Sequence, residues 1–148
     1  MKDKIIKDLL EAKEHLLASI NLMPDGTAVD KWSKKEILAH IAGWYEEGVD
    51  GTSKILKGEK PNSFRYSVDG YNKRSVEKRK DKNIVEILQE MEDLHRQFVD
   101  QVKNLSEEQI TGYFGTKLGG EPINVLWMIN ECISHDHAHA EELEQKYR

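Results

Sequence analysis

Residues Ile133 to Leu143 read ISHDHAHAEEL and hold three of the six histidines of the chain. On an α-helix, residues four positions apart lie about 40° apart around the axis, and residues two positions apart lie about 200° apart. His135 and His139 therefore share one face, while His137 is expected to point to water. The shared face continues along the stripe formed by Met128, Cys132 and Leu143.

This stripe should face a core, and the paired imidazoles suggest a transition-metal site. Two neutral imidazoles at i and i+4 can reach one divalent ion without bending the backbone. The same spacing also occurs in core or boundary histidines that hold no metal. A third histidine from another helix would favour the metal site.

Composition predicts one globular domain that spans residues 1–148. The chain has 148 residues, of which 38% are hydrophobic and 33% charged. A net charge of −5 argues against nucleic acid as a partner. With one cysteine, no apolar run near the ~18 residues of a membrane span and no signal-like start, we expect a cytoplasmic protein without a membrane partner.

Apolar residues recur at helical spacing in four segments. We expect helices over residues 5–20, 34–56 and 84–105, and a fourth from Pro122 to the end, with a turn at residues 24–26 between the first two. Capping boxes mark two of the starts, and the residues that form them are Ser33 with Glu36 and Asn83 with Glu86.

The remaining segments are less regular. Residues 58–67 are expected to form a loop, and SVDGYNKRSVEKRK (67–80) a short polar helix around Tyr71. The basic patch from Lys73 to Lys82 also contains acidic residues, so we expect a solvated helix end. For residues 106–123 we expect one short turn of helix followed by a loop.

The other histidines are placed by their helical angle. His40 lies on the flank of the apolar stripe of the second helix, facing either a cleft between helices or solvent. His95 lies at the edge of the third stripe, as either a ligand or a buried, hydrogen-bonded histidine. His15 lies off the first stripe and is expected on the surface.

Four amphipathic helices without a convincing strand pattern predict an all-α bundle, in which metal sites form between facing helices. The segment WSKKEILAHIAGW (32–44), followed by H-x3-H in SHDHAHAEEL (134–143), resembles the DinB-like (DinB/YfiT) superfamily of four-helix bundles. The resemblance covers nearly the whole chain. It implies an up-down-down-up topology and a metal site formed by His40, His135 and His139.

The middle segment, residues 69–110, resembles the DfsB/ClbS-type branch of this superfamily, whose best-known member protects cells from a reactive cyclopropane-bearing genotoxin. Other relatives are transferases and isomerases that use a low-molecular-weight thiol, and many have no assigned reaction. The resemblance therefore leaves the substrate open.

Three histidine ligands would leave a coordination position for water or thiolate, as in catalytic metal sites. A divalent transition metal, zinc or nickel, would supply a nucleophile at neutral pH. We expect a metal-dependent enzyme acting on a small reactive molecule by thiol transfer or hydrolysis. Two alternatives stay open: a protein that binds or sequesters a small molecule without turnover, and an interaction protein with vestigial histidines.

The residues beside the histidines do not identify a catalytic group. Asp136 and Glu142 either orient a ligand or act as a base, but surface carboxylates are the simpler interpretation. Cys132 fits a small buried residue better than a nucleophile. A cavity is expected beside Trp44 and residues 113–121. A homodimer is expected through the apolar residues off the main stripes, Leu126, Trp127, Ile133 and Val85.

Overall fold

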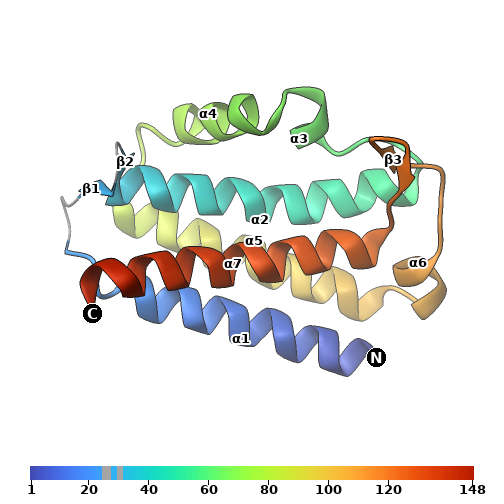
Figure 1. Ribbon diagram of the computed structural model, residues 1–148, viewed down its shortest axis with the longest axis horizontal. Helices are drawn as coiled ribbons and strands as arrows, with labels where there is room; N and C mark the ends of the chain where they lie inside the picture. Colours follow the sequence, from blue (N-terminus) through green and yellow to red (C-terminus); the bar gives the residue numbers. More distant parts are fainter. Residues whose placement is uncertain (25–27, 30–31) are drawn as a thin grey trace.

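The computed structural model describes residues 1–24, 28–29 and 32–148. Its framework is a bundle of four long helices, α1 (Lys2–Ile20), α2 (Lys34–Leu56), α5 (Ile84–Asn104) and α7 (Val125–Tyr147). In Figure 1, α1 and α7 run in one direction and α2 and α5 in the other, which gives the up-down-down-up order. Helix α1 packs mainly on α7, and α2 mainly on α5. The predicted all-α four-helix bundle is confirmed.

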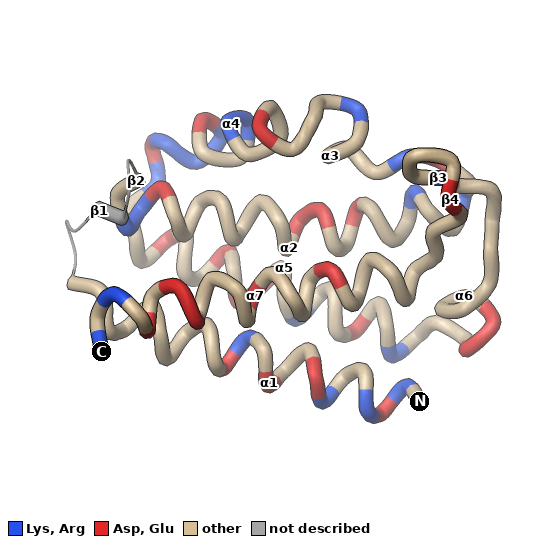
Figure 2. The backbone as a smooth tube through the Cα atoms, viewed as in Figure 1, with Lys and Arg blue, Asp and Glu red and all other residues tan. Residues whose placement is uncertain are grey.

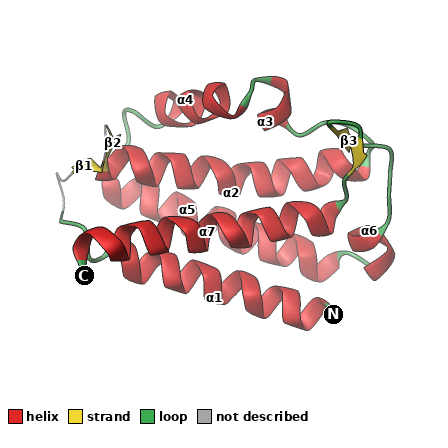
Figure 3. Cartoon of the chain, in the orientation of Figure 1, coloured by secondary structure: helices red, strands yellow, loops and turns green. Residues whose placement is uncertain are grey.

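Short elements connect these helices (Figure 3). They are α3 (Asn62–Arg65), α4 (Val68–Lys78), α6 (Glu107–Thr111), and two antiparallel hairpins, β1 (Ala28–Val29) with β2 (Trp32–Ser33) and β3 (Lys117–Leu118) with β4 (Glu121–Pro122). The polar helix predicted around Tyr71 is confirmed as α4. The segment 58–67, predicted as a loop, contains the single helical turn of α3.

The start of the last helix differs from the prediction. Gly119 and Gly120 have φ values of 56° and 85°, which suit the two-residue turn of a β-hairpin. Pro122 therefore lies in β4 and not in the first helical turn. Helix α7 begins after Asn124, whose side chain accepts a hydrogen bond from the Trp127 backbone N–H at 2.8 Å. An asparagine cap satisfies the helix start without help from the proline.

Both predicted capping boxes are confirmed. The Ser33 side chain accepts from the Glu36 backbone N–H at 3.1 Å, and the Asn83 side chain from the Glu86 N–H at 2.9 Å. These caps fix the starts of α2 and α5. The turn predicted at residues 24–26 lies, apart from Pro24, outside the described residues.

Buried apolar side chains form two clusters toward opposite ends of the bundle. One contains Leu9, Phe98 and Ile129, and the other contains Leu16, Ile41 and Met91. Where the clusters meet, three buried side chains carry polar atoms, and we call them the polar layer: Tyr45, His95 and Asp136. This layer lies within α2, α5 and α7, and two of these helices carry His40, His135 and His139.

Helix α4 is held closely against α2. The Tyr71 hydroxyl donates to the Gly43 backbone carbonyl at 2.6 Å. A Cβ at Gly43 would lie 2.1 Å from the Ser75 Oγ, so the two helices approach closely only because residue 43 is glycine.

The end of α4 corrects the prediction for the basic patch. Arg79 is 1% exposed, and its guanidinium donates to Glu46 at 2.6 Å and to Glu90 at 2.8 Å. The patch is therefore not simply a solvated helix end, because one of its cations joins α4 to α2 and α5. Figure 2 shows charges of both signs interspersed along α1 and α4.

Candidate metal centre

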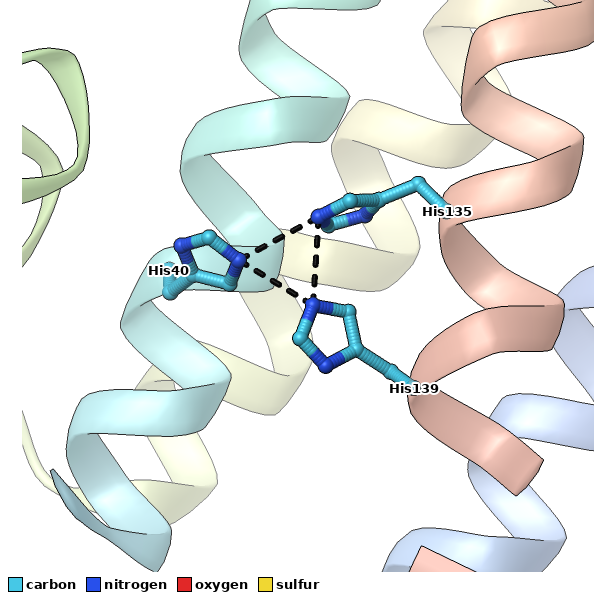
Figure 4. Close-up of side chains that lie close together, drawn as sticks. All are labelled: His40, His135 and His139. Atoms are coloured by element: carbon cyan, nitrogen blue, oxygen red, sulfur yellow. Dashed lines mark hydrogen bonds between the residues drawn. The ribbon is translucent and has the colours of Figure 1, made fainter. Parts of the chain in front are cut away.

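Three imidazoles from α2 and α7 converge on one point (Figure 4). The Nε2 atom of His40 lies 3.2 Å from Nε2 of His135 and 3.1 Å from Nε2 of His139. The Nε2 atoms of His135 and His139 are 3.1 Å apart. The structure therefore brings together the three histidines that the resemblance assigned to a metal.

Hydrogen bonding alone does not satisfy this arrangement. In a neutral imidazole each ring nitrogen is either a donor or an acceptor. Among three nitrogens in mutual contact, at least one pair must then face lone pair to lone pair or proton to proton. A cation at the centre would accept all three lone pairs at once.

The spacing also suits a transition metal. Zinc held by imidazole at about 2.0–2.1 Å in tetrahedral geometry separates its ligand nitrogens by about 3.3 Å. The observed separations of 3.1 to 3.2 Å are close to this value. The donor set therefore fits a divalent transition metal, although imidazole does not select one metal.

Burial keeps these histidines neutral. Desolvation, followed by repulsion from His139, lowers the pKa of His40 to about 4. Desolvation, followed by repulsion from His139 and His40, lowers the pKa of His135 to about 2. Desolvation also lowers the pKa of His139, with Glu142 opposing it. Neutral imidazoles offer their lone pairs to a metal at pH 7 without releasing a proton.

Aromatic rings position the triad. The ring of Trp32 lies edge-on to His40 with centroids 5.0 Å apart, and the ring of Trp44 lies 5.3 Å from His135. The Trp44 indole N–H donates to Asn72 of α4 at 2.9 Å. The close approach of α4 to α2 therefore fixes a ring that borders the triad.

His137 departs from the prediction that it points to water. Its Nδ1 lies 2.8 Å from Nδ1 of His15 on α1, and both residues are half-buried. His15 Nε2 also bonds the carboxylate of Glu144, which accepts a further hydrogen bond from Ser19 at 3.0 Å. The helix-angle argument correctly separated His137 from the pair, but it overlooked that α1 packs along this side of α7. For the same reason, His15 is not simply a surface residue.

His95 is a buried histidine and not a member of the triad, which was one of its two expected roles. It is 2% exposed and its ring lies edge-on to Tyr45, with centroids 5.1 Å apart. Burial, with a smaller effect of Lys13, lowers its pKa to about 4. It belongs to the polar layer and not to the triad.

Asp136 is not a surface carboxylate. It is 2% exposed, and its Oδ2 accepts a hydrogen bond from the Tyr45 hydroxyl at 3.0 Å. Desolvation raises its pKa to about 7, with the Tyr45 bond opposing the shift. Its position four residues after Cys132 was the sequence signal for burial, because that spacing continues the inward stripe.

The other neighbours of the triad match their simpler interpretations. Glu142 is exposed. Cys132 is buried, and desolvation raises the pKa of its thiol well above the usual range, so it is not a ready nucleophile.

A cavity of about 340 Å³ lies beside the triad. Both Trp44 and Leu118 line it, as expected for an opening beside Trp44 and residues 113–121. His135 and Asp136 also line it, so the cavity borders the triad directly. Its wall includes Phe64 of α3, a residue that the sequence did not indicate because residues 58–67 were predicted to form a loop.

Comparison with known proteins agrees with the fold. The sequence profile of the DinB superfamily matches residues 9–143. The chain belongs to the DinB superfamily. The profile identifies the superfamily and not a branch, so the DfsB/ClbS-type assignment stays a prediction.

One solved relative has a similar fold. It is an uncharacterised protein from Escherichia coli UTI89, whose crystal structure matches with a TM-score of 0.70 at 14% sequence identity. The match covers 99% of this chain and 92% of that chain. At this identity, the likeness shows a shared fold and says nothing about activity. No curated protein matches the chain.

Proposed function

We propose that this member of the DinB superfamily is a metal-dependent enzyme that acts on a small reactive molecule by hydrolysis or thiol transfer. The observation that carries the proposal is the convergence of three neutral imidazoles beside a cavity. His40, His135 and His139 would hold a divalent transition metal, zinc or nickel. When bound, the ion would supply Lewis-acid activation of a water or of a low-molecular-weight thiol at its open position.

The chain's own groups would bind and orient the substrate. Trp44, Phe64 and Trp127 offer apolar walls that exclude water from the reacting groups. His135 and Asp136 are consecutive residues that both line the cavity, so a bound molecule would lie against the triad and a buried carboxyl. Asp136 bonds Tyr45 and not a triad imidazole, which argues against a role in orienting the ligands.

A second candidate is binding or sequestration without turnover. The apolar cavity supports it as well, since such walls hold a small molecule whether or not chemistry follows. Metal content and turnover separate the two functions.

The test starts with untagged protein supplied with zinc or nickel. We expect about one ion per chain by mass spectrometry of metals, and none in His139→Ala. Wild-type protein that stays metal-free after supplementation overturns the enzyme proposal. A loaded protein that neither hydrolyses reactive electrophiles nor couples them to thiols favours sequestration.

We also propose that residues 1–148 form one domain and that the protein acts in the cytoplasm as a homodimer. Val85 on α5 is 74% exposed and supports a contact there, whereas Leu126, Trp127 and Ile133 already pack partly against the chain's own core. In the described part of the chain, no helix has the length and apolar character of a membrane span. Sedimentation velocity tests the dimer, and activity should survive dilution because the triad lies within one chain.

A further inference from the structure

The cavity beside the triad is mainly apolar, and the charged groups in its wall are all acidic. Its walls are mainly aromatic and aliphatic, contributed by α2, α3, the β3–β4 hairpin and α7. The charged groups among its described lining residues are two carboxyls, Glu131 and Asp136, with no lysine or arginine. A negatively charged molecule would therefore find no cationic partner among these residues.

The two oxygens of Asp136 are not equivalent. Oδ2 accepts the hydrogen bond from Tyr45 at 3.0 Å. Oδ1 is buried and has no hydrogen-bond partner among the described residues. A buried acceptor without a partner is unfavourable, so a ligand that donates to Oδ1 would offset that cost.

This pattern indicates a class of ligand. The reaction of that ligand rests on the proposed function, whereas its binding in the cavity does not. We propose that the cavity takes an aromatic or aliphatic molecule that carries a hydrogen-bond donor, such as an amine or hydroxyl, and that Asp136 Oδ1 accepts that bond. When Asp136 is ionised, a molecule with a carboxylate at the same point is rejected, because two acceptors would face each other without a proton donor.

The position of Asp136 also orients the ligand. It follows His135 directly in α7, and both side chains line the cavity. The donor-bearing end of the molecule would therefore lie beside the triad. Its apolar body would pack against Phe64 and Trp127, whose ring centroids are 5.6 Å apart. A volume of about 340 Å³ suits a molecule of one or two rings.

Three probes with one ring system test the proposal: 2-naphthylmethylamine, 2-naphthylmethanol and 2-naphthoate. Binding to metal-free protein is measured at about pH 8.5, where Asp136 is ionised, by calorimetry and by quenching of tryptophan fluorescence. The amine and the alcohol should bind at least about tenfold more tightly than the carboxylate. Equal affinity for all three, or no binding of any of them, overturns the proposal.

Asp136→Asn sharpens the test. Tyr45 would donate to the amide oxygen, which leaves the amide N–H₂ where Oδ1 stood and turns an acceptor into a donor. Naphthoate should then bind more tightly than to wild type, and the amine and the alcohol more weakly. Glu131→Gln is the matched control, because it removes a carboxyl at an exposed position of the same cavity. If Glu131→Gln also reverses the preference among the probes, or if Asp136→Asn weakens the binding of all probes equally, the role of Asp136 is contradicted.

A triad variant separates this proposal from the metal. His139 is a triad ligand but not among the residues that line the cavity. The preference among the three probes should persist in metal-free His139→Ala. If the wild type holds no metal but keeps the preference, the proposed function fails and the ligand class stands. If the wild type holds metal but its metal-free form lacks the preference, the ligand class fails alone.

Discussion

Tyr45 and Asp136 form a buried hydrogen bond of 3.0 Å between the two helices that carry the triad. Each residue is 2% exposed. Asp136 directly follows His135, and Tyr45 lies five residues after His40. The bond therefore fixes α2 against α7 next to the convergent imidazoles. The second oxygen of Asp136 has no hydrogen-bond partner in the part of the chain that the structure describes.

Removing this hydroxyl should destabilise the protein. Tyr45→Phe leaves both oxygens of a buried carboxyl without a donor, so the free energy of unfolding should fall by about 1–3 kcal/mol. Urea denaturation measures the change. Tyr113→Phe removes a hydroxyl from a side chain that is 51% exposed, and it should change stability by less than about 0.5 kcal/mol. Equal stability of wild type and Tyr45→Phe would show that the bond contributes nothing.

The main features of the fold were predictable because they depend on local patterns. Four apolar stripes and two capping boxes identified the long helices and the starts of α2 and α5. The start of the last helix was predicted too early, at Pro122. The reason is that the Gly119–Gly120 turn was interpreted as part of a loop and not as the turn of a hairpin. A two-residue strand carries too little periodicity to be recognised.

The candidate site was predictable in part. Helix geometry selected His135 and His139, but only the family resemblance added His40, because spacing within one helix says nothing about another. The contact of His137 with His15 depends on how α1 packs against α7, which no single stripe reveals. Arg79 was missed for the same reason, since its acidic partners come from two other helices.

The triad should account for tight metal binding. Alanine at His40, His135 or His139 should abolish high-affinity binding of zinc or nickel, because two imidazoles and water hold these ions far more weakly. Alanine at His137 should leave the affinity nearly unchanged, since that ring faces His15. Competition with a chromogenic chelator measures each affinity. Equal losses in His137→Ala and His135→Ala would contradict the assignment of helix faces.

The cap of α2 should influence metal affinity as well as stability. Ser33→Ala removes the acceptor for the Glu36 N–H and should cost about 0.5–2 kcal/mol. His40 lies in the second turn of the same helix, so fraying of its start should also weaken metal binding. Thermal unfolding and chelator competition give the two readouts.

Asn83→Ala is the matched control for this cap. It removes the equivalent acceptor at the start of α5, a helix without a triad histidine. Its cost in stability should be similar, and its effect on metal affinity should be small. Unchanged melting of Ser33→Ala would indicate that the capping bond does not stabilise α2.

His95 should make the metal-free protein sensitive to acid. Burial lowers its pKa from the usual 6.5 to about 4, so the unfolded chain binds a proton in a pH range where the folded chain does not. The stability contributed by neutral His95 is complete above pH 6.5 and is lost as the pH falls to 4. A shift of this size corresponds to up to about 3 kcal/mol. Urea denaturation of wild type and His95→Gln at several pH values between 7.5 and 4 isolates this effect, because the triad histidines titrate in both proteins and cancel in the difference. The wild type should lose its advantage over His95→Gln progressively toward pH 4, and a difference independent of pH would show that His95 is not held neutral by burial.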